Sequence, residues 1–119
     1  MSPPEDKSEL SRRTQFYKGV LELSLLSLLD DGPQYGLQLL ENLKLKAGLE
    51  LSEGTLYPLL HRLEKQGLII SEWQIEATAS HPRKYYKLTP SGHDELSAQT
   101  QLWLSLSQTL NQFLTRKAV

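Results

Sequence analysis

Cysteine is absent from the 119 residues. This absence excludes disulfide bonds, thiolate metal sites, iron–sulfur clusters and a cysteine nucleophile. A long hydrophobic run is also missing, because the longest apolar stretch, residues 20–29, is interrupted by Glu22, Ser24 and Ser27 and is too short to span a bilayer. The polar first residues, MSPPEDKSELSRRT, lack the apolar segment of a signal peptide. We therefore expect a cytoplasmic protein without membrane contact.

Motifs of enzymes are missing as well. Ser91, His93 and Asp94 are close in sequence, but a helix directs such neighbours to different sides, so their spacing makes no catalytic triad. His61, His81 and His93 do not have metal-ligand spacing, and no glycine-rich phosphate loop is present. We expect neither an enzyme nor a cofactor or metal site.

Charge of neither sign dominates, because 13 Lys and Arg residues balance 14 Asp and Glu residues to a net charge of −1. This balance excludes a basic coat over the whole surface but permits a local basic patch. One segment is locally basic: no acidic residue lies between Glu76 and Asp94, where Arg83, Lys84 and Lys87 are found. This asymmetry is the strongest charge signal in the sequence.

Leucine is abundant, at 26 residues, and favours helix. Helix-breaking glycines and prolines and helix-capping residues divide the chain into the expected elements. After a disordered arm at 1–8, we expect helices at 9–17, 18–29, 35–47, 52–65 and 90–116. We also expect a small edge strand at 49–51 and strands at 68–75 and 83–88. Ser52 is a suitable N-cap, and Thr89-Pro90 is a typical helix start. In the second of the longer helices, the spacing of Leu37, Leu40, Leu43 and Ala47 predicts one apolar face.

This order of elements predicts a mainly α fold with a small β-hairpin, namely a winged helix-turn-helix. Its domains are a DNA-binding unit at 9–89 and a C-terminal dimerisation helix at 90–116. In such a fold the helix at 52–65 enters the major groove, and the hairpin, or wing, touches the flanking backbone. Arg62 and Lys65 lie on the outer face of that helix, which also carries His61. A solvated helix face explains these cations equally well by themselves, but basic residues in both the helix and the wing favour DNA.

The last helix carries apolar residues that step alternately by three and four. They form a heptad seam of Leu96, Gln99, Trp103, Leu106, Leu110 and Phe113. The seam can pack on its own domain or pair with a second chain. Because the helix extends well beyond the others, we expect a homodimer, with Phe16 as a further contact. Trp73 is assigned to the core or to a dimer contact, without a chemical role.

At this point three strings resemble a known family. Residues 54–68, GTLYPLLHRLEKQGL, closely resemble the recognition-helix signature of the PadR family of bacterial transcriptional regulators. Residues 82–89, PRKYYKLT, resemble its wing signature, and residues 32–36, GPQYG, resemble its turn before the second helix. The resemblance covers residues 16–114 and also accounts for Pro58 inside the predicted helix.

The resemblance implies a dimeric winged-helix repressor that binds an inverted repeat. A single C-terminal helix is similar to the compact subgroup of the family, in which some members border a cavity for flat aromatic ligands with paired tryptophans. Trp103 matches that tryptophan, so the resemblance implies a small planar aromatic ligand there. The alternative, that Trp103 only fills the dimer seam, stays open.

The main hypothesis is therefore double-stranded operator DNA as partner, and the expected contacts fall into three groups. Backbone N–H groups at the start of the second helix meet phosphate, the outer face of the third helix enters the groove, and the wing holds the flanking backbone. The residues are Tyr35 and Gly36, then Ser52, Thr55, Tyr57, Pro58, Arg62 and Lys65, and finally Arg83, Lys84 and Tyr85. The alternative is a dimeric adaptor that binds proteins and no operator.

Overall fold

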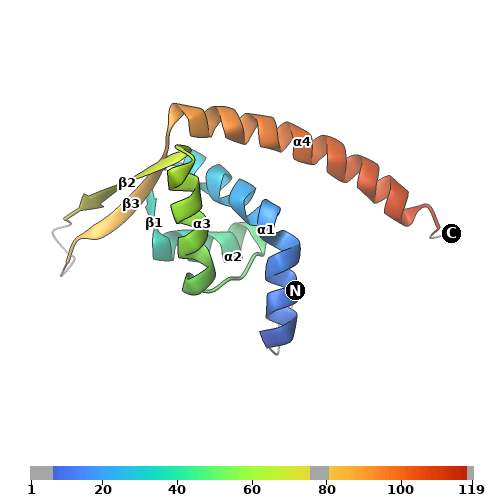
Figure 1. The fold of residues 1–119 in the computed structure, drawn as a ribbon, viewed down its shortest axis with the longest axis horizontal. Helices are drawn as coiled ribbons and strands as arrows, with labels where there is room; N and C mark the ends of the chain where they lie inside the picture. The colour runs from blue at the N-terminus through green and yellow to red at the C-terminus, as the bar shows by residue number, and fades with distance from the viewer. Residues whose placement is uncertain (1–6, 76–80, 118–119) are drawn as a thin grey trace.

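The described part of the chain runs from a long helix through two shorter helices and a β-hairpin to a second long helix (Figure 1). The computed structural model describes residues 7–75 and 81–117, with side chains from residue 17 onward. The elements are α1 (Lys7–Asp30), β1 (Gln34–Tyr35), α2 (Gly36–Ala47), α3 (Glu53–Lys65), β2 (Ile69–Gln74), β3 (Arg83–Leu88) and α4 (Pro90–Thr115). The predicted fold, mainly helical with a small hairpin and a long last helix, is confirmed.

Three local predictions need correction. The helices expected at 9–17 and 18–29 form one helix, α1, which begins at Lys7, and residues 1–6 of the expected arm lie outside the described residues. The edge strand expected at 49–51 does not form, and Leu49 is buried in the core instead. The third strand is β1, which pairs antiparallel with β3 and gives the order β1-β3-β2 among the described residues.

The core is built almost entirely from leucine. α1 supplies Leu25 and Leu26, and α3 supplies the face with Leu56, Leu60 and Leu63. In α2 Leu39 and Leu43 are buried, and Leu40 packs against the core. Leu37 and Ala47 are exposed, so the predicted face is correct in its middle and wrong at its two ends. Burying these side chains removes apolar surface from water and is the main force that stabilises the fold.

The ends of α3 follow the sequence prediction. Ser52 Oγ accepts a hydrogen bond from the backbone N–H of Thr55 at 3.3 Å, which satisfies one free donor of the first turn. Pro58 lies inside the helix, as expected, on its exposed side. Because Pro58 donates no hydrogen bond, the carbonyl of Gly54 loses its partner there, and its exposed position leaves that oxygen accessible to water.

α4 is fixed at its beginning and leaves the rest of the molecule afterwards. Thr89 Oγ1 donates to the Gly67 carbonyl at 2.6 Å and accepts from Gly92 N–H at 3.0 Å. Gly92 lies so close to the Leu68 carbonyl that a Cβ would collide with it. His93 Nδ1 is 3.1 Å from Asp30 Oδ1, which joins α4 to the end of α1. These contacts set the direction of α4.

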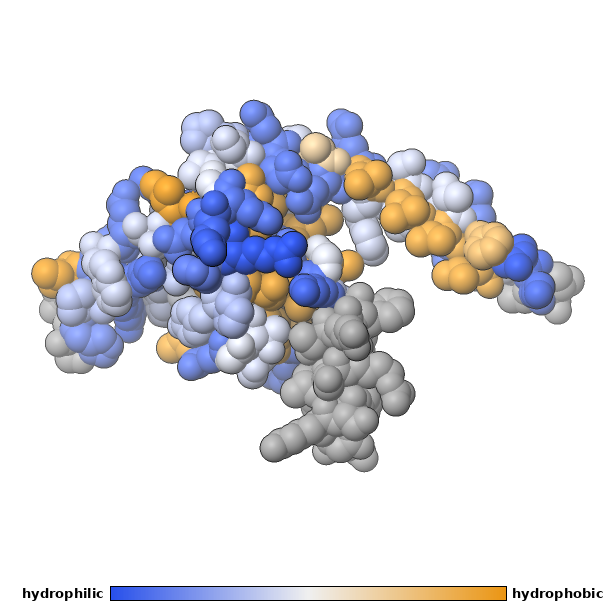
Figure 2. Space-filling model, in the orientation of Figure 1, coloured by the Kyte–Doolittle hydropathy of each residue, from blue (hydrophilic) through white to orange (hydrophobic). Residues whose placement is uncertain are grey.

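The molecule is elongated because of α4 (Figure 1). Its radius of gyration is 16.3 Å, whereas a compact chain of this length has about 13.5 Å. We call residues 17–75 and 81–96 the body, and residues 97–115 distal α4. Distal α4 projects away from the body and presents a row of apolar side chains along its length (Figure 2).

Candidate nucleic-acid interface

The exposed side of α3 carries a stripe of residues spaced by four, three and four: Gly54, Pro58, His61 and Lys65. This spacing places them on one face of the helix. His61, which the sequence placed on the outer face of this helix, therefore lies in the middle of the face that is opposite the buried leucines. Its spacing from Pro58 and Lys65 is the signal that identifies it.

Arg62 lies beside this stripe and contacts α1. Its Nε is 3.4 Å from Oε1 of Glu22, a side chain that is only 16% exposed, while Arg62 itself is 54% exposed. The structure therefore brings Arg62 together with an acidic residue of the first helix, and not with Lys65 or the wing. Thr55 lies at the start of α3, where its hydroxyl is 3.3 Å from that of Ser52.

The start of α2 packs against the other side of α3. Gly36 is buried, and a Cβ there would collide with the ring and hydroxyl of Tyr57. Glycine at this position therefore lets the Tyr57 ring lie on the first turn of α2. The backbone N–H of Tyr35 donates to Gln38 Oε1 at 3.1 Å, so this amide, expected to meet phosphate, already has a partner within the chain.

A buried glutamine holds the turn that leads into α2. Gln34 Nε2 donates to the Leu28 carbonyl at 2.6 Å, and Gln34 Oε1 accepts from Asn42 Nδ2 at 2.8 Å. Because a buried amide without partners costs free energy, these bonds favour one conformation of the turn. They fix the position of α2 relative to α1, and with it the position of Gly36.

The two faces of β3 differ, as the alternation of its residues predicts. Tyr86 is buried toward α3, and the Lys84 ammonium group lies 5.6 Å from its ring centre. On the opposite face the Tyr85 ring meets Tyr35 edge-on at 5.4 Å, and the Arg83 guanidinium lies 4.5 Å from the Tyr35 ring centre. Lys84 thus extends toward α3, while Arg83 and Tyr85 group with Tyr35.

Tyr86 stays uncharged at the base of the wing. Burial raises the pKa of its phenol above 10.0, and the negative charge of Glu64 and the neighbouring Tyr57 raise it further. Glu64 is held in place by a hydrogen bond from Ser71 Oγ at 3.0 Å. The Lys84 ammonium group therefore lies over an uncharged ring, and Tyr86 does not neutralise its positive charge.

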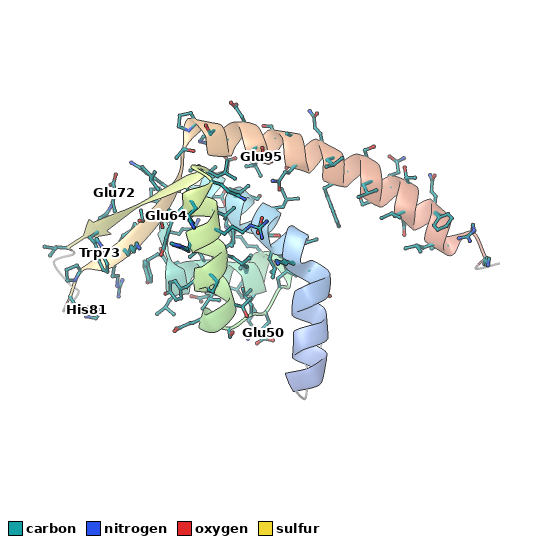
Figure 3. All side chains as sticks on the ribbon, in the orientation of Figure 1. Glu50, Glu64, Glu72, Trp73, His81 and Glu95 are labelled. Carbon is teal, nitrogen blue, oxygen red and sulfur yellow. The ribbon has the colours of Figure 1, made fainter. Side chains whose placement is uncertain are left out.

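An open groove of about 620 Å³ lies between the start of α2, α3 and the wing. One wall is formed by Tyr57 and Leu37, the floor by Tyr86, and the other wall by Trp73 and Lys84. Among the residues that the structure describes, the lining carries no carboxylate. Figure 3 places Trp73 and His81 on the wing side of this groove. The segment 76–80 at the wing tip lies outside the described residues.

Trp73 is the residue that the sequence assigned to the core or a dimer contact. It is 69% exposed, so the assignment to the core is wrong. It stands directly opposite Lys84 in the β2–β3 ladder. Trp73 is on the same face of β2 as Ile69 and Ser71, because residues two apart in a strand point to the same side. That face is turned toward α3, so Trp73 lies on the groove wall.

The heptad seam separates into two parts. Leu96 packs against the core, whereas Trp103, Leu106, Leu110 and Phe113 are between 43% and 53% exposed. The side chain of Phe16 lies outside the described part of the structure. Within the described residues, no group of histidines and carboxylates is arranged to hold a metal ion, and no helix is apolar enough over sufficient length to cross a membrane.

Comparison with known proteins agrees with this architecture. The sequence matches the model of the transcriptional regulator PadR-like family over residues 25–98. A curated transcriptional regulator of Mycobacterium tuberculosis is 35% identical over 83 residues, which cover 70% of this chain and 75% of the relative. A solved PadR-like transcription factor from Bacteroides fragilis is 41% identical, with a TM-score of 0.70 and coverage of 87% of this chain and 98% of that one. A PadR family regulator from Eggerthella lenta is 36% identical, with a TM-score of 0.76 and coverage of 92% and 94%.

Proposed function

This chain belongs to the PadR-like family of transcriptional regulators, and from that premise we propose that it is a homodimeric repressor of an inverted-repeat operator. The observation that carries the proposal is the continuity of two surfaces. The exposed stripe of α3 adjoins a groove whose described lining contains cations and aromatic rings but no carboxylate. Such a surface complements a polyanion.

In this proposal α3 enters the major groove, with His61 and Lys65 near the base edges. Lys84 and Arg83 contact the flanking phosphates, with Tyr35 and Tyr85 beside them, and the first turn of α2 at Gly36 provides a partial positive charge. Ser52, Thr55, Tyr57 and Pro58 complete the contact surface. Arg62 lies at its edge.

Two recognition helices are needed for an inverted repeat, so the proposal includes a dimer. Distal α4 exposes apolar residues at heptad spacing, and a second copy of α4 would bury them. The two α3 helices would then lie about 34 Å apart, which is one turn of DNA.

The test is fluorescence anisotropy of a labelled DNA fragment from upstream of the gene, compared with a scrambled fragment at two salt concentrations. We expect preferential binding to the upstream fragment that persists at the higher salt, with affinities that fall with salt as counterions are released. Equal and weak binding to both fragments would contradict operator binding there. Partner capture that is insensitive to salt would favour the alternative, a protein-binding adaptor.

We also propose that Trp103 contributes to a site for a planar aromatic ligand between the two α4 helices. The indole is 45% exposed in the single chain and lies on the heptad seam of α4, where two copies of the helix would offer facing aromatic surfaces. Trp103→Ala should weaken binding of a planar dye while DNA binding persists. Unchanged dye affinity would contradict the ligand site. Such a ligand relieves repression only if it binds the free and DNA-bound states with different affinities.

A further inference from the structure

The two faces of the wing are chemically different. On the outer face, Lys87 Nζ forms an ion pair with Glu72 Oε1 at 3.1 Å, so cation and anion neutralise each other. On the face toward α3, Trp73 is paired in the ladder with Lys84, and the described groove lining there includes no carboxylate. Among the described residues, the face toward α3 therefore presents an exposed indole directly opposite a lysine, in a groove whose lining has no carboxylate.

The packing of the single chain does not explain why Trp73 is so exposed. An indole that is 69% exposed leaves a large apolar surface in water, which is unfavourable unless a partner covers it. The neighbouring side chains within the groove do not cover it, although Tyr86 next to it in the same sheet is buried. Rings on strands whose position is fixed by the ladder lose little freedom on binding.

The pairing of Trp73 with Lys84 also matches the alternation of sugar and phosphate along a DNA strand. Residues directly opposite each other in an antiparallel ladder have Cβ atoms about 5 Å apart. Trp73 and Lys84 are such a pair, so an apolar surface and an ammonium group stand side by side. A DNA strand presents the same alternation, with an apolar sugar face next to each phosphate.

We propose that Trp73 packs against a deoxyribose of the DNA strand that passes between the wing and α3, while Lys84 binds the adjacent phosphate. The inference rests on the proposed function and extends it by one residue and one contact type. Sugar contacts carry no base identity, so Trp73 contributes affinity on every sequence and adds nothing to discrimination between operators.

Fluorescence tests this placement directly, because the chain has two tryptophans, one in each region. In the Trp103→Phe background Trp73 is the sole indole. Addition of DNA should quench its emission and protect it from acrylamide. In the Trp73→Phe background, Trp103 should show no such change. Anisotropy of the labelled DNA is recorded in the same samples, which reports complex formation independently.

Affinity measurements supply the second readout. Trp73→Ala should weaken binding about tenfold on operator and scrambled DNA alike. The dependence on salt should stay unchanged because an indole releases no counterions, whereas Lys84→Ala should lower the salt slope by about 0.9. The matched control is Ile70→Ala, an exposed apolar residue on the opposite face of β2, which should leave affinity unchanged. Trp73→Phe keeps a ring, should lose less affinity, and guards against misfolding of the alanine variant.

Three results would overturn the inference. If anisotropy rises while Trp73 emission and its acrylamide quenching stay constant, DNA binds without this contact, and the proposed function alone survives. If Trp73 emission changes with protein concentration and not with DNA, the indole belongs to a protein contact. If no DNA raises the anisotropy, the proposed function fails and this inference with it.

Discussion

Leucine is frequent in both the body and distal α4, but its surroundings differ between the two regions. In the body, leucines from three helices are fully buried, among them Leu26, Leu43 and Leu60. In distal α4 every leucine is at least 43% exposed. Distal α4 also contains no charged residue, since none occurs between Glu95 and Arg116. The body thus buries most of its leucines within the chain, whereas distal α4 leaves all of its leucines exposed in the single chain.

The largest expected effect is the loss of stability on truncating a buried leucine of the body. Leu60→Ala should lower the free energy of unfolding by about 3 kcal/mol, because Leu60 is completely buried and its truncation leaves a cavity. The loss should be the same at every protein concentration. Urea denaturation measures it, and Leu45→Ala, at an exposed position of α2, is the control that should stay within about 0.5 kcal/mol of the wild type. A loss of that small size in Leu60→Ala would contradict the assigned core.

The second prediction concerns the junction between the two regions. Gly92→Ala should cost about 2 kcal/mol, because the added Cβ meets the Leu68 backbone carbonyl, which cannot rotate away as a side chain can. The strain should also displace α4 relative to the body and weaken operator binding by the dimer. Urea denaturation and DNA anisotropy measure the two effects. Ser91→Ala is an exposed neighbour in the same helix turn and should change neither; equal behaviour of the two variants would contradict the close contact.

The third prediction sharpens the comparison within distal α4. Leu106→Ala should raise the dissociation constant of the dimer about tenfold, a change of about 1.4 kcal/mol. Leu106→Ala should therefore change the free energy of unfolding only at protein concentrations at which the dimer forms. Leu102→Ala, an exposed leucine outside the heptad seam, should change dimerisation less. Sedimentation equilibrium measures both constants. An equal effect of the two variants would place the dimer contact on another face of α4.

The contrast also shows what the sequence could predict. Local signals predicted well, because Ser52 and Thr89 cap the expected helices. Signals that depend on tertiary contacts did not. β1 has two residues and no periodicity, and it becomes a strand only because β3 lies beside it. In α2 packing buries Leu39 beside Leu43 of the predicted face and leaves Leu37 exposed.

The site was predictable to the same extent. The residue types on α3 and the wing pointed to DNA, and the signature strings located both elements. The partners of individual side chains were not predictable, because they come from distant segments. From the sequence Trp73 was assigned to the core or to a dimer contact, and only the fold places it on the wall of an open groove.

Arg62 gives the smallest effect and the finest test of where the internal packing of the body ends and its proposed DNA surface begins. If the ion pair with Glu22 is its main contact, Arg62→Ala should lower stability by about 1 kcal/mol or less, because the arginine side chain is 54% exposed and water screens the pair. Glu22→Gln should cost a similar amount. The double variant should then cost less than the sum of the two single losses.

DNA binding separates this role from a base contact. If Arg62 only joins α1 to α3, Arg62→Ala should leave the dependence of DNA affinity on salt unchanged. Lys65 lies on the exposed stripe of α3, and if it binds phosphate, Lys65→Ala should lower the slope of that dependence by about one unit. A loss of 1–3 kcal/mol on the operator but not on scrambled DNA would instead identify Arg62 as a base contact. That result would mean that DNA draws Arg62 away from Glu22, so that Arg62 belongs to the DNA surface of the body and not to the packing between α1 and α3.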